Sequence, residues 1–131
     1  MKIKVFADTI CGWCFIGQTR LNKALKAFPE TKFEIEHVPF QLNTDMPKEG
    51  IERNKYLEIK FGGKEFAQPM YDRMMEEANK ENLNFNLDKI KKLCIKKMRL
   101  WPSMLNLFTM VIGTQKQDLN CKKLSTLKRI K

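Results

Sequence analysis

The sequence predicts an α/β fold that opens with a strand, a helix and a second strand. The prediction depends on apolar residues that alternate over residues 2–7 and again over residues 32–38, and on a helical apolar stripe between these two segments. Because the three elements follow one another closely, we expect the two strands to be parallel and the helix to connect them.

The first strand is expected at residues 2–7, where the apolar residues at alternate positions share one face. Asp8 and Thr9 follow it. Their short polar side chains are good caps for helix N-termini, so they predict a helix start directly before two cysteines.

The helix is expected between Cys14 and Pro29. One stripe of this segment is apolar and its flanks are basic or polar, which is typical of a helix that packs on a core. Pro29 disfavours helical backbone at the residue before it and should end the helix. The members of the stripe are Cys14, Leu21, Ala24, Leu25 and Phe28.

The second strand is expected at residues 32–38, where Phe33, Ile35 and His37 alternate with glutamates. His37 falls on the apolar side. We therefore interpret it as a hydrogen-bonded core histidine rather than a proton shuttle.

After the second strand, turn-forming residues lead into two predicted helices, at residues 51–61 and 64–82, which a pair of glycines separates. Pro69 should kink the second helix or mark its first turn. This helix has a stripe at four-residue spacing, which we interpret as core packing. The stripe consists of Met70, Met74 and Ala78. Residues 82–92 are predicted to be a connection.

The net charge of +10 comes from the C-terminal part of the chain. Residues 1–90 carry 14 basic and 14 acidic side chains, whereas the last 41 residues carry 11 basic side chains and one acidic side chain. Basic chains often bind nucleic acid, but this segment lacks the regularly interleaved aromatic residues of a stacking platform, so we expect no nucleic-acid partner. No segment reaches the roughly 20 apolar residues of a membrane span.

We expect a cytoplasmic protein, because residues 1–7 alternate charged and apolar residues instead of forming the apolar core of a signal peptide. Structural disulfides are rare in a reducing cytoplasm. Four cysteines, two of them in a C-x-x-C motif, therefore favour catalysis or metal binding.

The stretch "DTICGWCFIG" at residues 8–17 holds this motif, and it falls where the first strand gives way to the helix. A cysteine at a helix N-terminus has a lowered pKa, so we predict that Cys11 attacks a disulfide and that Cys14, one turn further on, resolves the mixed disulfide. Gly12 and Trp13 would tune the redox poise, with Trp13 offering an apolar surface to substrate. Such a reaction needs no cofactor.

Two other interpretations of the motif remain. The cysteines could be ordinary core residues, or they could form half of a zinc site. Zinc needs four ligands, usually arranged as two pairs. The further candidates are His37, Cys94 and Cys121, and none of them is paired at ligand spacing. We therefore expect no metal.

The segment "KVFADTICGWCFIGQTRLNKAL" resembles the start of the DsbA-like thioredoxin-fold oxidoreductases, in particular the FrnE-like branch of predicted dithiol–disulfide isomerases. That branch has an aspartate followed by C-P-W-C-[YF]-x-G, and here Gly12 stands in place of the proline. Later stretches, "HVPFQLNTDMPKEG", "YLEIKFGG" and "MYDRM", also match in order. The resemblance covers about residues 2–92.

The resemblance implies a thioredoxin-like unit at residues 1–42 and the start of an inserted helical subdomain at residues 43–92. It implies thiol–disulfide exchange with protein or small-molecule thiols and disulfides. Residues 93–131 show neither the T-P-N-T-like stretch, the A-H-R helix nor the V-P loop of the family. We interpret them as an atypical basic tail, frameshifted or disordered, and expect the C-terminal half of the fold to be missing.

Two alternative functions follow from the same residues. Kappa-class glutathione transferases and hydroxychromene-carboxylate isomerases resemble this branch and use glutathione, but they usually have a serine near the position of the dithiol. The other alternative is a non-catalytic truncated chain that keeps the dithiol without a substrate groove.

Overall fold

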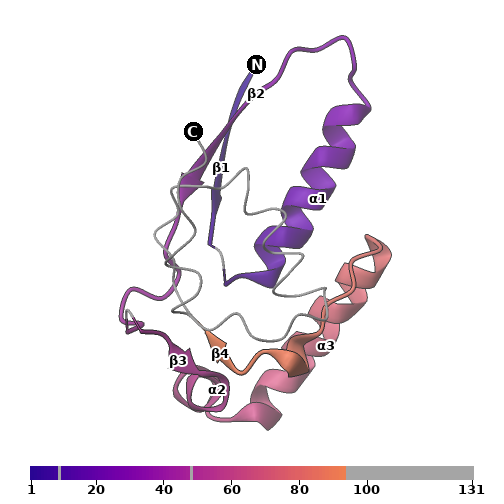
Figure 1. Ribbon diagram of the computed structural model, residues 1–131. Helices are drawn as coiled ribbons and strands as arrows, with labels where there is room; N and C mark the ends of the chain where they lie inside the picture. The colour runs from indigo at the N-terminus through magenta and orange to yellow at the C-terminus, as the bar shows by residue number, and fades with distance from the viewer. Residues whose placement is uncertain (9, 48, 94–131) are drawn as a thin grey trace.

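The computed structural model describes residues 1–8, 10–47 and 49–93 (Figure 1). Four strands, three α-helices and one short 3-10 helix lie within this part of the chain. In chain order they are β1 (Lys2–Ala7), α1 (Gly12–Lys26), β2 (Glu34–Pro39), β3 (Ile51–Glu52), α2 (Arg53–Phe61), α3 (Lys64–Lys80), η1 (Leu87–Lys89) and β4 (Lys92–Leu93). The predicted tail at residues 93–131 lies outside the described residues except for its first residue.

The predicted strand–helix–strand unit is confirmed. β1 and β2 pair in parallel, in a register that runs from Lys2 opposite Glu34 to Ala7 opposite Pro39. The first strand has the predicted bounds, and the second begins two residues later than predicted. Figure 1 shows α1 running beside this two-stranded sheet, as the connection between parallel strands requires.

The start of α1 differs from the prediction. Cys11, rather than Asp8 or Thr9, is the N-cap residue, and its sulfur accepts the N–H of Cys14. Asp8 lies too far upstream to cap the helix, and its carboxylate binds other backbone groups. Thr9 lies outside the described residues.

The predicted apolar stripe of α1 is only partly buried. The helix ends at Lys26, so Phe28 falls outside it, where helical spacing no longer applies, and its side chain is 61% exposed. Ala24 is exposed as well. The helix instead buries Gly12 and Ile16, which pack toward α3 and its core, and Gln18, which contacts His37 of β2.

The two later helices are confirmed. α2 ends at Gly62, whose φ of 80° is the left-handed conformation that glycine adopts without strain. α3 begins at Lys64 and continues through Pro69, which lies in its second turn. Before α2, residues 51 and 52 form a short antiparallel pair with β4 that the sequence did not predict.

The core lies between α1, α3 and the segment after α3. Its buried members are Ile16, Met74, Ala78, Phe85 and Leu87. Two of the three residues of the predicted α3 stripe, Met74 and Ala78, therefore belong to the core. Residues 82–92 were predicted to be a connection, but this segment supplies two of the five core side chains because the chain folds back over α3.

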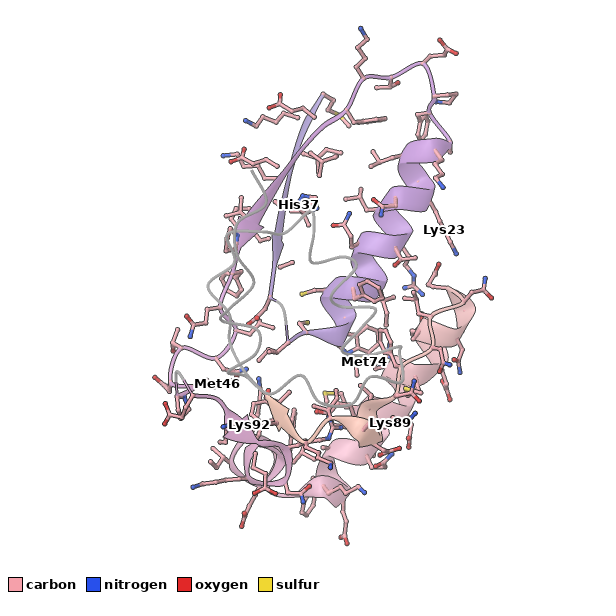
Figure 2. All side chains as sticks on the ribbon, in the orientation of Figure 1. Lys23, His37, Met46, Met74, Lys89 and Lys92 are labelled. Carbon is pink, nitrogen blue, oxygen red and sulfur yellow. The ribbon has the colours of Figure 1, made fainter. Side chains whose placement is uncertain are left out.

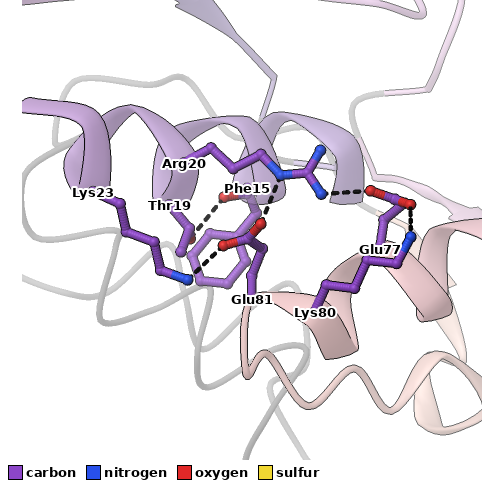
Figure 3. A network of polar contacts seen from close by, with 7 residues as sticks. All are labelled: Phe15, Thr19, Arg20, Lys23, Glu77, Lys80 and Glu81. Atoms are coloured by element: carbon purple, nitrogen blue, oxygen red, sulfur yellow. Dashed lines mark hydrogen bonds and ion pairs between the residues drawn. The ribbon is translucent and has the colours of Figure 1, made fainter.

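A network of ion pairs joins the exposed sides of α1 and α3 (Figure 3). The Arg20 guanidinium contacts the carboxylates of Glu77 and Glu81, and the Lys23 ammonium lies 2.6 Å from Glu81. Lys80 pairs with Glu77 at 2.6 Å within α3. We call this set of five residues the α1–α3 ion network. The α1–α3 ion network links α1, which follows Cys11 and contains Cys14, to α3.

Within residues 1–8, 10–47 and 49–93, none of the helices combines the length and the apolar character that crossing a membrane requires. The predicted boundary between a unit at residues 1–42 and a helical subdomain at residues 43–92 stays a prediction.

Candidate redox site

The two cysteines lie at the C-terminal end of β1, where the chain turns into α1. Both are free thiols, and both side chains are partly buried. The turn that holds the cysteines follows β1 directly, and helical geometry places Cys11 and Cys14, three residues apart, one helical turn from each other. The sulfur of Cys11 lies 3.3 Å from the backbone nitrogen of Cys14, which donates to it.

The helix N-terminus acts directly on Cys11. The Cys14 side chain and burial raise the pKa of the Cys11 thiol overall, and the backbone N–H groups of Cys14 and Trp13 act in the opposite direction. The N–H of Cys14 donates both to the carbonyl oxygen of Cys11, at 3.1 Å, and to its sulfur, and this first turn carries the positive end of the helix dipole. This part of the prediction, a dithiol exposed to a helix N-terminus, agrees with the structure.

The two thiols also interact with each other, and this interaction is the largest influence on both. The side chain of Cys11 lowers the pKa of Cys14 to about 6. The side chain of Cys14 raises the pKa of Cys11, because a thiolate on Cys11 would form beside the negative charge already on Cys14. The pair therefore loses its first proton far more readily than its second.

The sequence-based expectation placed the attacking, low-pKa thiol at Cys11, and that assignment stays a prediction. Spacing showed that the sulfurs are close but not which of them donates. Within the coupled pair, the pKa of Cys14 is lowered and that of Cys11 is raised, which favours the first negative charge on Cys14.

Asp8 connects this turn to the chain that follows β2. Its side chain is 1% exposed, and its carboxylate accepts the N–H of Ile10 at 3.2 Å and that of Leu42 at 2.7 Å. Its backbone lowers the pKa of Cys14 and its negative charge raises it. Sequence analysis treated Asp8 as a helix cap and as a residue of the family motif, and assigned it no role at the thiols. The signal that could have indicated more was a lone acid at the C-terminal end of the first strand.

Gly12 and Trp13 occupy different environments. Gly12 is buried against α3, whereas the Trp13 side chain is 37% exposed beside the two thiols. Trp13 therefore has the exposure that a substrate-facing surface would need. Gly12 faces the protein interior, so its influence on the thiols comes through packing.

His37 is partly buried in β2, and its Nε2 lies 3.1 Å from Oε1 of Gln18 in α1. Burial lowers its pKa. It is thus a hydrogen-bonded histidine, as predicted, and it joins the sheet to the helix. Among the described residues, no three histidine, cysteine, aspartate or glutamate side chains group as metal ligands. Cys94 and Cys121 lie outside the described residues.

A cavity of about 860 Å³ lies away from β1, between the loop that follows β2, α2 and β4. Its lining is mostly apolar, with lysine and carboxylate side chains at its edge. The lining residues are Leu42, Asn43, Thr44, Asp45, Met46, Pro47, Glu49, Gly50, Ile51, Glu52, Lys55, Tyr56, Ile59, Lys60, Lys91 and Lys92. None of them is a residue that the sequence singled out.

Comparison with known proteins gives one family match. The model of the DSBA-like thioredoxin domain matches residues 2–127. This match extends past residue 92, where the sequence-based resemblance was expected to stop. The predicted loss of the C-terminal half of the fold is therefore not confirmed, and the finer assignment to the FrnE-like branch stays a prediction.

A solved structure is also similar, that of a probable DsbA oxidoreductase from Streptomyces coelicolor. The two chains are 31% identical, with a TM-score of 0.57. The similar region covers 66% of this chain and 38% of the Streptomyces protein, so the match spans less than half of the latter's length. No curated protein matches the sequence significantly.

Proposed function

Because this chain belongs to the family of DSBA-like thioredoxin domains, we propose that it is a thiol–disulfide oxidoreductase whose reacting groups are Cys11 and Cys14. The observation that carries the proposal is the pair of free thiols at the N-terminus of α1, where Cys11 is the N-cap residue and its sulfur accepts the N–H of Cys14 at 3.3 Å. The pKa of Cys14 in this pair is lowered to about 6. Thiolates, not thiols, attack disulfides, so such a pair is reactive at neutral pH.

The reaction is an exchange of two electrons and two protons with a substrate of the disulfide class. A thiolate of the pair attacks one sulfur of the substrate disulfide, forms a mixed disulfide and releases the other sulfur as a thiolate, which takes up a proton. The second thiol of the pair then attacks the mixed disulfide. The protein ends with a Cys11–Cys14 disulfide, and the substrate ends with two thiols. The reverse sequence oxidises a dithiol substrate.

We assign the attack on substrate to Cys11 and the resolving step to Cys14. Cys11 is the N-cap residue and its sulfur accepts the N–H of Cys14, so the helix N-terminus favours negative charge on this sulfur once its proton has left. When substrate approaches Cys11, transfer of the shared proton to Cys14 exposes the attacking thiolate. The proposal covers protein and small-molecule thiols and disulfides as substrates, and it covers both directions of exchange.

A trapping experiment tests the proposal and the assignment together. The background is the full chain with Cys94→Ser and Cys121→Ser, so that only the pair can react. Treated with oxidised glutathione, this chain should form an intramolecular disulfide, detected by mass spectrometry. Cys14→Ser should instead accumulate a glutathione mixed disulfide on Cys11, and Cys11→Ser should react more slowly.

Each departure from this pattern has a definite meaning. A background chain that forms no Cys11–Cys14 disulfide over a range of glutathione ratios would overturn the proposed function. A faster reaction of Cys11→Ser than of Cys14→Ser would keep the function but reverse the roles of the two sulfurs.

A further inference from the structure

The backbone of Gly12 lies in direct contact with α3. A Cβ atom built on Gly12 would lie 2.5 Å from Sδ and 3.2 Å from Cε of Met74, and 3.4 Å from Cε2 of Phe85. Real Cβ atoms essentially never approach another atom within 3.0 Å. The thioether of Met74 therefore occupies the space that any side chain at position 12 would need.

This contact is specific to one glycine of the helix. Gly17 lies further along α1, and a Cβ built there meets no described atom within 4 Å beyond its own helix backbone and chain neighbours. Gly17 is an exposed position, so it is a glycine of the same helix that lacks this contact.

The thioether is the far end of a flexible side chain, so it is the surrounding core that keeps Met74 in this position. Its side chain is 4% exposed and belongs to the core with Ile16, Ala78 and Phe85. Interiors packed at this density accept a shifted side chain only if neighbours shift too. Figure 2 shows Met74 where α3 meets the first turn of α1. Core side chains thus enclose Met74, and its sulfur faces Gly12.

Gly12 in turn lies between the two sulfurs along the backbone. The hydrogen bond from the Cys14 N–H to Cys11 Sγ spans it, and Gly12 is the first residue of the helix. Hydrogen bonds weaken as their angles depart from linearity. Any displacement of Gly12 therefore changes how the N–H groups of this turn point at the Cys11 sulfur.

We propose that Met74 is a positioning residue for the Cys11–Cys14 dithiol, and that glycine at position 12 is required by it. The thioether holds the first turn of α1 in the orientation that directs its N–H groups at Cys11. Met74 contacts the turn and not the substrate, so it acts through the geometry of the thiols. This inference rests on the proposed function for its meaning, but its first readout is independent of any redox reaction.

The test uses the full chain and four variants: Met74→Ala, Gly12→Ala, the double variant and Met74→Leu. The first readout is the pH profile of Cys11 and Cys14 alkylation by iodoacetamide, with sites assigned by mass spectrometry. Met74→Ala should raise the pH midpoint of alkylation toward that of a free thiol, because the first turn of α1 loses its contact with the thioether. Met74→Leu should keep the native profile, since the two side chains have similar volumes.

Gly12→Ala should move the profile in the same direction, because the new methyl group pushes the turn away from α3. The double variant should recover most of the native profile, because the alanine methyl group enters the space that Met74 vacates. This recovery is the distinctive result. Shifts that simply add in the double variant would mean that the two positions act independently, and would overturn the proposal.

The second readout is the equilibrium with glutathione. A less stabilised thiolate makes the reduced state less favourable, so each single variant should form the intramolecular disulfide about tenfold more readily, which corresponds to about 30 mV for a two-electron couple. Gly17→Ala and Met75→Ala are the matched controls and should leave both readouts unchanged. Met75 flanks the same core without lying against Gly12.

The remaining outcomes are also decisive. If Gly12→Ala fails to fold, folding of the double variant supports the proposal, and its failure to fold overturns it. If the unchanged chain forms no disulfide with glutathione, the proposed function is wrong, and the alkylation profiles still decide whether Met74 positions the thiols. If Met75→Ala shifts the profile as much as Met74→Ala, the effect is general loosening of the core and the specific role is wrong.

Discussion

At the residue scale, Asp8 has the most consequential environment after the two cysteines. A carboxylate that is 1% exposed and accepts two backbone N–H groups holds the turn before α1 to the loop after β2. Its charge also opposes a thiolate on Cys14. The side chain therefore stabilises the local fold and at the same time raises the pKa of a reacting group.

Asp8→Asn should separate these two effects. The amide keeps one acceptor oxygen, but its NH2 group faces a backbone N–H, so we expect a loss of about 1–3 kcal/mol in the free energy of unfolding. Removing the negative charge should also lower the pH at which the dithiol begins to react. Urea unfolding and the alkylation profile measure the two effects. Asp45→Asn, at an exposed loop position, is the control. An upward shift of the profile would contradict the stated role of the charge.

Gly17 provides the opposite case to Gly12. It is an exposed position inside α1, and a Cβ there meets no described atom outside its own helix and chain neighbours. Alanine restricts the unfolded chain and favours helix, so Gly17→Ala should stabilise the chain by about 0.5–1 kcal/mol. Thermal or urea unfolding measures this gain. A loss of stability would show that position 17 has a packing role in the folded chain.

At the scale of elements, the α1–α3 ion network and the core beneath it hold the same two helices together. Hydrogen bonds to Arg20 and Lys80 lower the pKa of Glu77 to about 2, and those to Lys23 and Arg20 lower the pKa of Glu81. Both glutamates therefore favour the folded state above the unfolded-state pKa of about 4.3, and this contribution is lost as the pH falls toward 2. Because the cations are about half exposed, the network should be sensitive to salt.

Arg20→Gln tests the network. It should lower the thermal unfolding midpoint by at most a few degrees at low salt and neutral pH, and the difference from the unchanged chain should shrink in 1 M salt. The same difference should disappear as the pH falls through the range between 4.3 and 2. Lys26→Gln removes the same charge from the same helix at a residue that makes no ion pair with any described residue, and serves as the control. An equal effect of both changes would show that net charge, rather than the network, is responsible.

At the scale of the whole molecule, the regular elements were predictable because periodicity and stop signals agree in them. The alternation of residues 2–7, Pro29 and the Gly62–Gly63 pair each gave a boundary to within a few residues. The burial of Phe85 and Leu87 was not predictable, because it depends on the chain folding back over α3 and leaves no local period.

The candidate site also has a part that the sequence predicted and a part that it did not. The C-x-x-C spacing and the strand-to-helix context placed both thiols correctly at a helix N-terminus. The contact of Met74 with Gly12 joins residues that are 62 positions apart, and no local pattern carries it. The coupling between the two thiols is likewise a property of three-dimensional geometry, and spacing alone does not indicate which sulfur takes the lower pKa.

The dithiol should also leave a signature in the stability of the whole reduced chain. In the unfolded chain both thiols titrate near the free-thiol value of about 8.5. In the folded chain the first proton leaves at the lowered pKa of Cys14, about 6, and the second leaves only at a raised pKa. Between pH 6 and 8.5 the unfolded state therefore binds more protons, and stability rises with pH. Above 8.5 the folded state holds the extra proton, and stability falls.

The measurement is the free energy of unfolding of the reduced chain in urea, taken from pH 5.5 to 10 with a reductant that stays active across this range. The same series on Cys14→Ser removes the thiol pair and leaves all other titrating groups in place, so the difference between the two curves isolates the dithiol. That difference should pass through a maximum near pH 8.5. A difference that does not change with pH would mean that the two sulfurs do not share a proton in the folded chain. A lower maximum at the same pH in Met74→Ala would connect the packing of α3 to the same equilibrium, because a rise in the first pKa narrows, from its lower end, the pH range over which stability increases.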